Sequence, residues 1–200
     1  DCIYNTITLR LTENTFMPLP SQNGNLSKKC LNELLSEINN FDTIVFGCGL
    51  GTSSDIKEVL GELILKSQKP LIIDADGLNA LVEIKDVLKK AKCNILLTPH
   101  PGEMARLINK DVTYIQNNRE KVVNDFVNEY NVNVLLKGHN TIISDSNATA
   151  MCINKTGNTG LSKGGSGDLL SGMIAGFTPS LKGDLFKAAS LGAYIHGKTS

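Results

Sequence analysis

A Gly-rich segment that leads into an apolar helix carries the residue types best suited to chemistry in this chain. It covers residues 157–176, and its centre, residues 163–168, reads KGGSGD. Glycines let the backbone approach a ligand closely, and the first amides of a helix point outward without partners. The amides of Gly165, Ser166 and Gly167 therefore predict an anion site suited to a phosphate group.

Asp168 follows directly, on the rim of this predicted anion site. A carboxylate there is repelled by a phosphate, so its presence suggests a function, such as taking a proton from a hydroxyl group that attacks phosphorus. The alternative is that Asp168 only caps the helix after the Gly-rich turn. The segment alone leaves both interpretations open.

Length and composition limit the classes of protein that need to be considered. The 200 residues suit one domain over residues 1–200, and the 20 basic and 20 acidic residues cancel, which gives no net attraction to nucleic acid or a membrane surface. No apolar run is long enough to span a membrane. The five cysteines never show a CxxC spacing, which argues against a zinc site or a disulfide framework and favours a reduced cytoplasm. Because the first residue is Asp1 and the chain stops soon after a helical pattern, both ends are expected to be cut.

The elements that must position Asp168 follow an order of strand, polar turn and helix. Buried strands are expected at residues 43–46, 71–73, 94–97 and 132–136, and helices at about 27–39, 54–67, 78–88, from 103, 112–130 and 184–196. A further strand is expected at residues 3–11 and a hairpin at 141–144 and 148–154. The alternation predicts a three-layer α/β fold with a mainly parallel central sheet flanked by helices.

Four polar clusters fall where the predicted strands end. They are residues 47–51, 74–79, 98–103 and 137–141. In open α/β sheets, ligands bind at the carboxyl ends of the strands. We therefore expect these clusters to line one edge of the sheet, together with the Gly-rich segment.

Several side chains in these clusters have two readings. Asp74, Asp76 and Asn79 could hold Mg²⁺ directly or through water, or form a turn and a helix cap. His100 stands between two prolines and suits a ligand contact better than core packing. Glu103 either caps the helix it begins or contacts substrate or metal-bound water.

The remaining basic side chains are interpreted by their neighbours. Lys137, at a strand end before a glycine, can neutralise a phosphate or be a solvated lysine. His139 and His196 have no informative spacing and are expected on the surface. The cluster at residues 47–51 is similar to a dinucleotide fingerprint but lacks its full spacing.

Together, these motifs resemble the NAD(P)H-hydrate dehydratase family of the ribokinase-like superfamily, over almost the whole chain. The resemblance rests on GCGLG, DADGLN, TPHPGE and KGHNT at the four strand ends and on GGSGD at 164–168. GGSGD is shared with many ribokinase-like kinases, whereas the DADGLN and HPGE turns are specific to the family. Cys48, Thr159 and Lys163 depart from the family pattern, and nothing matches the Gly-rich strand and helix with which the family begins.

The resemblance implies a repair lyase that dehydrates hydrated NADH and NADPH, (6S)-NADHX and NADPHX, at the expense of ADP or ATP with Mg²⁺, through a phosphorylated hydrate. It implies Asp168 as the catalytic base and the amides of Gly165, Ser166 and Gly167 as the anion hole. The matching nucleotide-binding positions are Lys137, Gly138, His139, Asn140, Thr141 and Gly167, and the substrate-contacting positions are Gly49, His100 and Asp168. Asp74, Asp76, Asn79 and Glu103 are candidates for association with Mg²⁺, and none is assigned as a metal ligand.

The resemblance also implies partners and leaves two alternatives. The implied functional partner is an NAD(P)H-hydrate epimerase, which a full-length chain can carry as a fused domain, and a cytoplasmic homo-oligomer is expected. A ribokinase-like kinase for a vitamin precursor (a hydroxymethylpyrimidine, thiazole or pyridoxal) would share the fold and Asp168 but release a phosphorylated product. A non-catalytic nucleotide-binding module would keep the loops and tolerate loss of the base.

Overall fold

A six-stranded sheet forms the centre of the chain, which the computed structural model describes over residues 4–22 and 24–199. The strands lie side by side in chain order: β3 (Ile44–Phe46), β4 (Leu71–Ile73), β5 (Ile95–Leu97), β6 (Asn133–Leu136), β7 (Thr141–Ser144) and β8 (Met151–Asn154). Strands β3 to β6 are parallel, and β7 and β8 continue the sheet as antiparallel neighbours. The prediction of a mainly parallel sheet that ends in a hairpin is confirmed.

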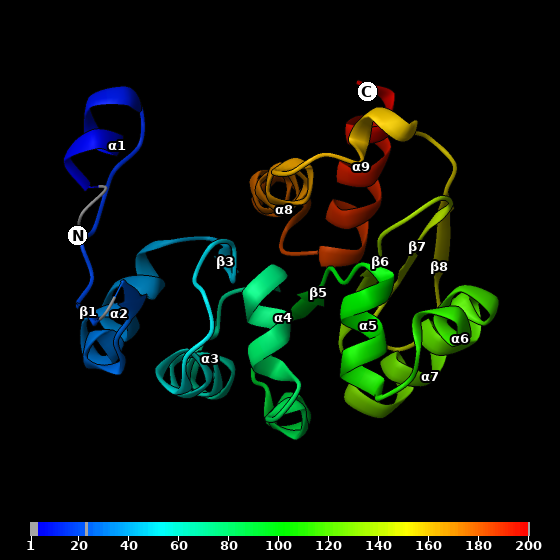
Figure 1. Ribbon diagram of the computed structural model, residues 1–200, viewed down its shortest axis with the longest axis horizontal. Coiled ribbons are helices and arrows are strands. Elements are labelled where there is room, and N and C mark those ends of the chain that lie inside the picture. Colours follow the sequence, from blue (N-terminus) through cyan, green and yellow to red (C-terminus); the bar gives the residue numbers. More distant parts are fainter. Residues whose placement is uncertain (1–3, 23, 200) are drawn as a thin grey trace.

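Helices cover both faces of this sheet (Figure 1). On one face lie α3 (Ser54–Lys66), α4 (Ala75–Leu81), α5 (Pro101–Ile108), α6 (Val112–Asn117) and α7 (Arg119–Tyr130), and on the other α8 (Ser166–Phe177) and α9 (Leu185–Lys198). Two further elements precede β3: a small sheet of β1 (Ser21–Gln22) and β2 (Asn25–Leu26), and helix α2 (Leu31–Glu37). Short 3₁₀ helices span Lys28–Cys30, Ile38–Asn40, Lys85–Lys90, Thr159–Leu161 and Pro179–Leu181. The three layers confirm the predicted α/β fold.

Alternation along the strands divides the core into two clusters. In β4, Leu71 and Ile73 pack with the helices of the α3–α7 face, whereas Ile72 between them packs with α8 and α9. The same division separates Leu97 from Leu96 in β5. Successive side chains of a strand point to opposite faces, so these continuous apolar runs are what a sheet buried on both sides requires.

Three predictions about element boundaries are corrected. The strand predicted over residues 3–11 is instead helix α1 (Tyr4–Arg10). Residue 3 lies outside the described residues. The alternating residues 4–10 have no strand to pair with, and no described side chain of α1 is buried. Helices α4 and α5 begin earlier than expected, at Ala75 and Pro101, because Asp74 and His100 are their caps. The expected helix over 112–130 is divided at Asn118 into α6 and α7.

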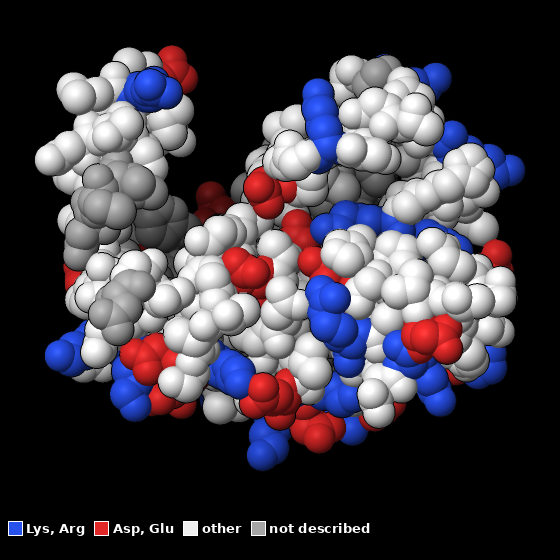
Figure 2. All heavy atoms as spheres, viewed as in Figure 1, with Lys and Arg blue, Asp and Glu red and all other residues white. Residues whose placement is uncertain are grey.

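Both signs of charge are scattered over the face shown in Figure 2, without a large area of one sign. This distribution agrees with the balance of 20 basic and 20 acidic residues. Within the described part of the chain, no helix combines the length and the apolar character needed to cross a bilayer.

Candidate active site

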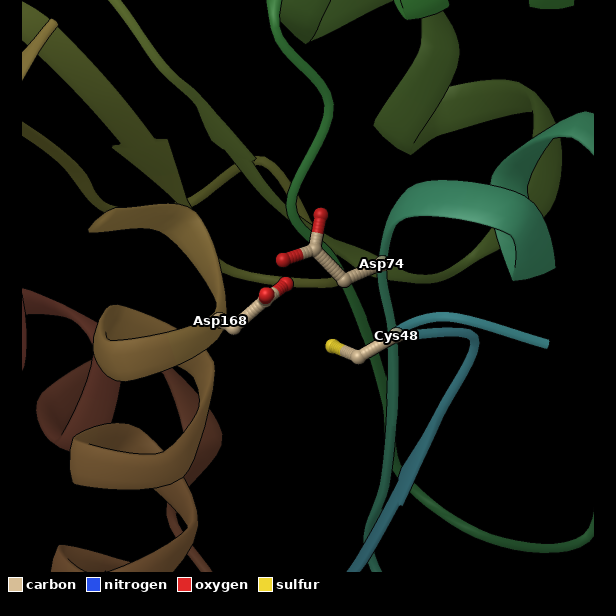
Figure 3. A group of neighbouring side chains, drawn as sticks. All are labelled: Cys48, Asp74 and Asp168. Atoms are coloured by element: carbon tan, nitrogen blue, oxygen red, sulfur yellow. The ribbon is translucent and has the colours of Figure 1, made fainter. Parts of the chain in front are cut away.

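The polar clusters at the ends of the four parallel strands meet the start of α8, as the sequence predicted. Figure 3 shows side chains from three of these segments pointing toward one another: Cys48 after β3, Asp74 after β4 and Asp168 on α8. One ligand atom of each lies within 4.8 Å of the others. Lys137, after β6, adds its ammonium group 2.8 Å from Asp74 and 3.9 Å from Glu103, which follows β5.

Asp74 connects the elements of this site. Its side chain is only 1% exposed, and Oδ1 accepts hydrogen bonds from the Ala75 amide (2.8 Å) and from Nζ of Lys137 (2.8 Å). Oδ2 accepts from the hydroxyl of Ser171 on α8 (2.7 Å). A buried carboxylate needs such partners. Asp74 therefore fixes Lys137 and the first turns of α8 relative to β4, and its association with Mg²⁺ stays a prediction.

The start of α8 has the geometry of an anion site. Gly165 is the N-cap with φ +83°, a left-handed conformation that favours glycine, and no side chain caps the helix. The Ser166 amide donates to the Lys163 carbonyl at 3.3 Å, which differs from the expected free amide. Within the described residues, the amides of Gly167 and Asp168 have no protein acceptor outside the helix. A β-carbon on Gly167 would stand 3.4 Å from Nζ of Lys137, so the start of α8 lies within contact distance of that ammonium group.

Asp168 is the third residue of α8, exposed to solvent, and faces Cys48 and Asp74 across the site (Figure 3). A capping side chain would bind the first amides of the helix, but α8 has no side-chain cap. The geometry thus favours the reading in which the carboxylate is available to a ligand. The backbone of the preceding residue, Gly167, also lies beside Lys137 and Asp74.

The thiol of Cys48 is part of this group. Its sulfur lies within 4.8 Å of carboxylate oxygens of Asp74 and Asp168. Burial first, and then the neighbouring carboxylates of Asp168 and Asp74, raise its pKa to about 12. The thiol is therefore protonated at neutral pH. It is therefore unsuited to act as a nucleophile.

His100 and Glu103 cap α5 reciprocally. His100 Nδ1 accepts from the amides of Gly102 (2.9 Å) and Glu103 (3.3 Å), and Glu103 accepts from the His100 amide (2.7 Å). This arrangement places the proton of a neutral His100 on Nε2, which is 3.5 Å from Glu103 Oε1 on a half-exposed ring. His100 is thus a cap of α5 with a half-exposed ring that a ligand can reach.

Asp76 and Asn79 hold neighbouring elements together. Asp76 accepts from the amide of Gly51 (2.8 Å), which ties residues 47–51 to α4. Asn79 Oδ1 accepts from Nε of Arg106 on α5 (3.1 Å). Gly49, which follows Cys48 in the 47–51 loop, is exposed and has a φ angle of +67°. A β-carbon added to Gly49 would meet no atom within 4 Å. A ligand at this loop would meet backbone rather than side chains.

The 137–141 loop lies beside the start of α8. Gly138 and Asn140 have positive φ angles, +131° and +57°, and the Thr141 hydroxyl donates to the Gly138 carbonyl at 3.0 Å. His139 is exposed, as predicted. The loop thus carries two residues in conformations that most side chains avoid, next to Lys137.

The prediction that His196 lies on the surface is wrong. The residue is only 8% exposed because α9 packs against α8, and Nε2 lies 3.3 Å from the hydroxyl of Ser166. Burial lowers its pKa below the ordinary value for histidine. His196 lines a cavity of ≈ 470 Å³ beside the start of α8, together with Leu161, Lys163, Gly165, Ser166 and Leu169.

Two polar side chains of this region were not found from the sequence. Ser171 donates a hydrogen bond to Asp74, 97 residues away in the sequence. Arg119 of α7 donates to the carbonyls of Leu136, at the end of β6, and Lys137, at the start of the 137–141 loop. Ser171 does lie one helical turn after Asp168, on the same side of α8, which is a detectable signal. Arg119 is in no motif, and only its position at the first turn of a helix distinguishes it.

Comparisons with known proteins agree with these motifs. A family model described as NAD(P)H-hydrate dehydratase matches residues 7–200. The bifunctional NAD(P)H-hydrate repair enzyme Nnr of Moorella thermoacetica is 38% identical over 193 residues, which are 96% of this chain and 36% of the relative. This chain therefore spans about a third of that relative.

Two solved structures resemble the fold. The ADP/ATP-dependent NAD(P)H-hydrate dehydratase of Bacillus subtilis, co-crystallized with ATP and Mg²⁺ and soaked with CoA, has a TM-score of 0.64 and 30% identity over 78% of this chain and 55% of its own. A ribokinase-like superfamily protein of Enterococcus faecalis has a TM-score of 0.64 and 26% identity over 86% of this chain and 58% of its own. The fold of this chain is therefore ribokinase-like.

Proposed function

The chain belongs to the NAD(P)H-hydrate dehydratase family, and on that premise we propose that it dehydrates (6S)-NADHX and NADPHX to NADH and NADPH at the expense of ADP or ATP. The observation that carries the proposal is the exposed carboxylate of Asp168 beside the open amides of α8 and the ammonium group of Lys137. A base adjacent to an anion site is what phosphoryl transfer to a substrate hydroxyl requires.

Asp168 takes the proton of the hydroxyl group at C6 of the hydrated nicotinamide ring. The oxygen then attacks the terminal phosphorus of the nucleotide, and the bond from this phosphorus to the bridging oxygen breaks. AMP is the leaving group when the donor is ADP, and ADP is the leaving group when the donor is ATP. The bond between C6 and the phosphate oxygen then breaks with release of inorganic phosphate. Loss of a proton from C5 to solvent re-forms the C5–C6 double bond and restores the dihydropyridine ring. The protonated thiol of Cys48 lies beside the Asp168 carboxylate.

The charge on the transferring group is met by the chain itself. The amides of Gly167 and Asp168 point from the start of α8, where the helix dipole favours an anion. Asp74 holds Lys137 at this position. The nucleotide is proposed to contact residues 137–141. The substrate is proposed to contact Gly49, His100 and Asp168. The cavity that His196 lines offers the nucleotide space beyond its phosphates.

Mg²⁺ in such reactions is commonly carried by nucleotide phosphates with few protein ligands. The carboxylates and amides predicted to associate with it are largely engaged: Asp74 with Lys137, Asp76 with Gly51, Asn79 with Arg106 and Glu103 with His100. This donor set does not form a protein cage for Mg²⁺. When bound with the nucleotide, the ion would neutralise phosphate charge.

The wider setting is proposed on the same premise. We propose one catalytic domain over residues 1–200, a cytoplasmic location, and cooperation with an NAD(P)H-hydrate epimerase, which the bifunctional relative suggests as a fused partner. Assembly into a homo-oligomer is also proposed, since the edge strand β8 exposes Met151 and Ile153. The vitamin-precursor kinase is not favoured, because the matching family model describes a dehydratase.

The test follows the recovery of NADH absorbance from (6S)-NADHX with ADP or ATP and Mg²⁺, together with release of phosphate. Recovery in step with phosphate release supports the proposal. A stable phosphorylated product without recovery would assign the chain to the kinases. Nucleotide binding without either reaction would leave a binding module.

A further inference from the structure

We infer that Arg119 is a positioning residue that shapes the 137–141 loop for the nucleotide; the inference rests on the proposed function in that this loop is taken as a nucleotide contact. Arg119 is the first residue of α7 and is 17 to 21 residues from its partners in the loop. No motif identifies it. Its role comes from where its guanidinium group lies.

The guanidinium group binds backbone carbonyls on both sides of the loop's turn. Nη2 donates to the carbonyl of Leu136 (3.1 Å), of Lys137 (3.3 Å) and, at 3.5 Å, of Asn140. Nη1 donates to Gln116 on α6 (3.1 Å). One cation thus joins the end of β6 to the beginning of β7, across the segment in which Gly138 and Asn140 have positive φ angles.

The fit between Arg119 and the loop is close. A β-carbon on Gly138 would stand 3.2 Å from Nη1 and 3.4 Å from Nη2, so a side chain at this position would crowd the guanidinium group. The side chain is partly buried, and desolvation lowers its pKa from the usual arginine value while leaving it charged. Hydrogen bonds from a charged donor are stronger than neutral ones, so this contact can hold a strained loop.

The position of Arg119 is unfavourable for its own helix. A cation at the first residue of α7 opposes the helix dipole, which favours acidic groups there. A residue that breaks a local rule is often kept for a role elsewhere in the molecule. Here, the loop carbonyls provide that role.

Arg119 also differs from Lys137 in its electrostatic balance. Lys137 is neutralised by Asp74 at 2.8 Å. Among the described residues, Arg119 has no carboxylate within ion-pair distance, and only carbonyl and amide oxygens accept from it. Arg119 therefore contributes positive potential directly beneath a loop that a polyanionic nucleotide would approach.

The experiment compares Arg119→Met and Arg119→Lys with Lys121→Gln, a matched change on the same helix at an exposed residue paired with Asp125. In the intact protein without ligand, hydrogen exchange of the amides at 138–141 is compared with that of Val134 and Leu135 in β6. Dissociation constants for ADP are measured by calorimetry, and KM and kcat in the NADHX assay. We expect faster exchange in the loop alone, ADP binding weakened about 10- to 100-fold by Arg119→Met, and kcat largely unchanged. Arg119→Lys retains the charge and should be intermediate, and Lys121→Gln should match the wild type.

Two results would overturn the inference. One is loop exchange and ADP affinity unchanged in Arg119→Met; the other is exchange raised equally in β6, which would make Arg119 a general packing residue. If the wild type itself fails to bind ADP or ATP, the proposed function fails. The exchange measurement then still decides whether Arg119 orders the loop.

Discussion

Cys48 makes a residue-scale prediction because its thiol is held in the protonated form next to Asp168. Burial and two carboxylates raise its pKa to about 12 from an ordinary value of about 9.0, so the reactive thiolate is roughly a thousandfold rarer near pH 8. Iodoacetamide should modify Cys48 correspondingly slowly, as followed by peptide mass spectrometry. Asp168→Asn removes one carboxylate and should accelerate the modification. Alkylation of wild-type Cys48 at the rate of an ordinary thiol would contradict this environment.

His196 makes a second prediction at the same scale, through pH. Its folded-state pKa lies below the unfolded value near 6.5, because protonation would bury a charge between α8 and α9. As the pH falls below about 6.5, the unfolded state binds the proton first, and the free energy of unfolding drops by at most about 1.4 kcal/mol per pH unit. The loss continues until the folded-state pKa is passed.

Urea denaturation at about pH 7 and about pH 5.5 measures this effect. His196→Asn should reduce the acid-dependent loss, whereas the matched change His139→Asn, at an exposed ring, should not. Equal acid dependence in wild type and His196→Asn would show that His196 is not the responsible group.

At the scale of elements, Asp74 and Lys137 join β4, β6 and α8. Asp74→Asn leaves the ammonium group of Lys137 without its buried counter-charge and should lower the free energy of unfolding by about 3 kcal/mol. The double change Asp74→Asn with Lys137→Met removes both charges and should recover part of the loss, since changes in contacting residues are not additive. Costs that simply add, measured by urea denaturation, would mean that the two groups do not interact.

The elements themselves were largely predictable, because each strand of the sheet core is a short apolar run that ends in a polar turn. The sequence predicts later starts for α4 and α5 than the structure shows. Asp74 and His100 suggest ligand contacts in the sequence, whereas in the structure they cap these helices. Residues 4–10 were misassigned because alternation predicts a strand only where a neighbouring strand pairs with it.

The site was predictable only where local sequence determines it. The turn at the start of α8 and the cluster of strand ends follow from glycines and from sheet topology. The partners of Asp74 could not be assigned, because Lys137 is 63 and Ser171 is 97 residues away. Arg119 was missed for the same reason. Tertiary hydrogen bonds of this kind leave no periodic signal in the sequence.

At the scale of the whole molecule, the stability resides in the two clusters that the sheet separates. Helix α1 contributes no buried described residue, and Leu9 is 84% exposed. Removal of the first ten residues should therefore change the free energy of unfolding by less than about 1 kcal/mol, whereas Ile72→Ala, in the sheet, should cost about 2–5 kcal/mol. A deletion as costly as Ile72→Ala would show that α1 has a packing role.

The paired measurement on Asp168→Asn tests the central claim most directly, because it separates binding from chemistry. Asparagine keeps the size of the side chain and removes the base. Folding and ADP or ATP affinity should be retained, and affinity can rise because a negative charge beside the phosphates is lost. The rate of NADH recovery from (6S)-NADHX should fall by roughly two to four orders of magnitude. Wild-type turnover in Asp168→Asn would contradict the account and leave this carboxylate without a catalytic role.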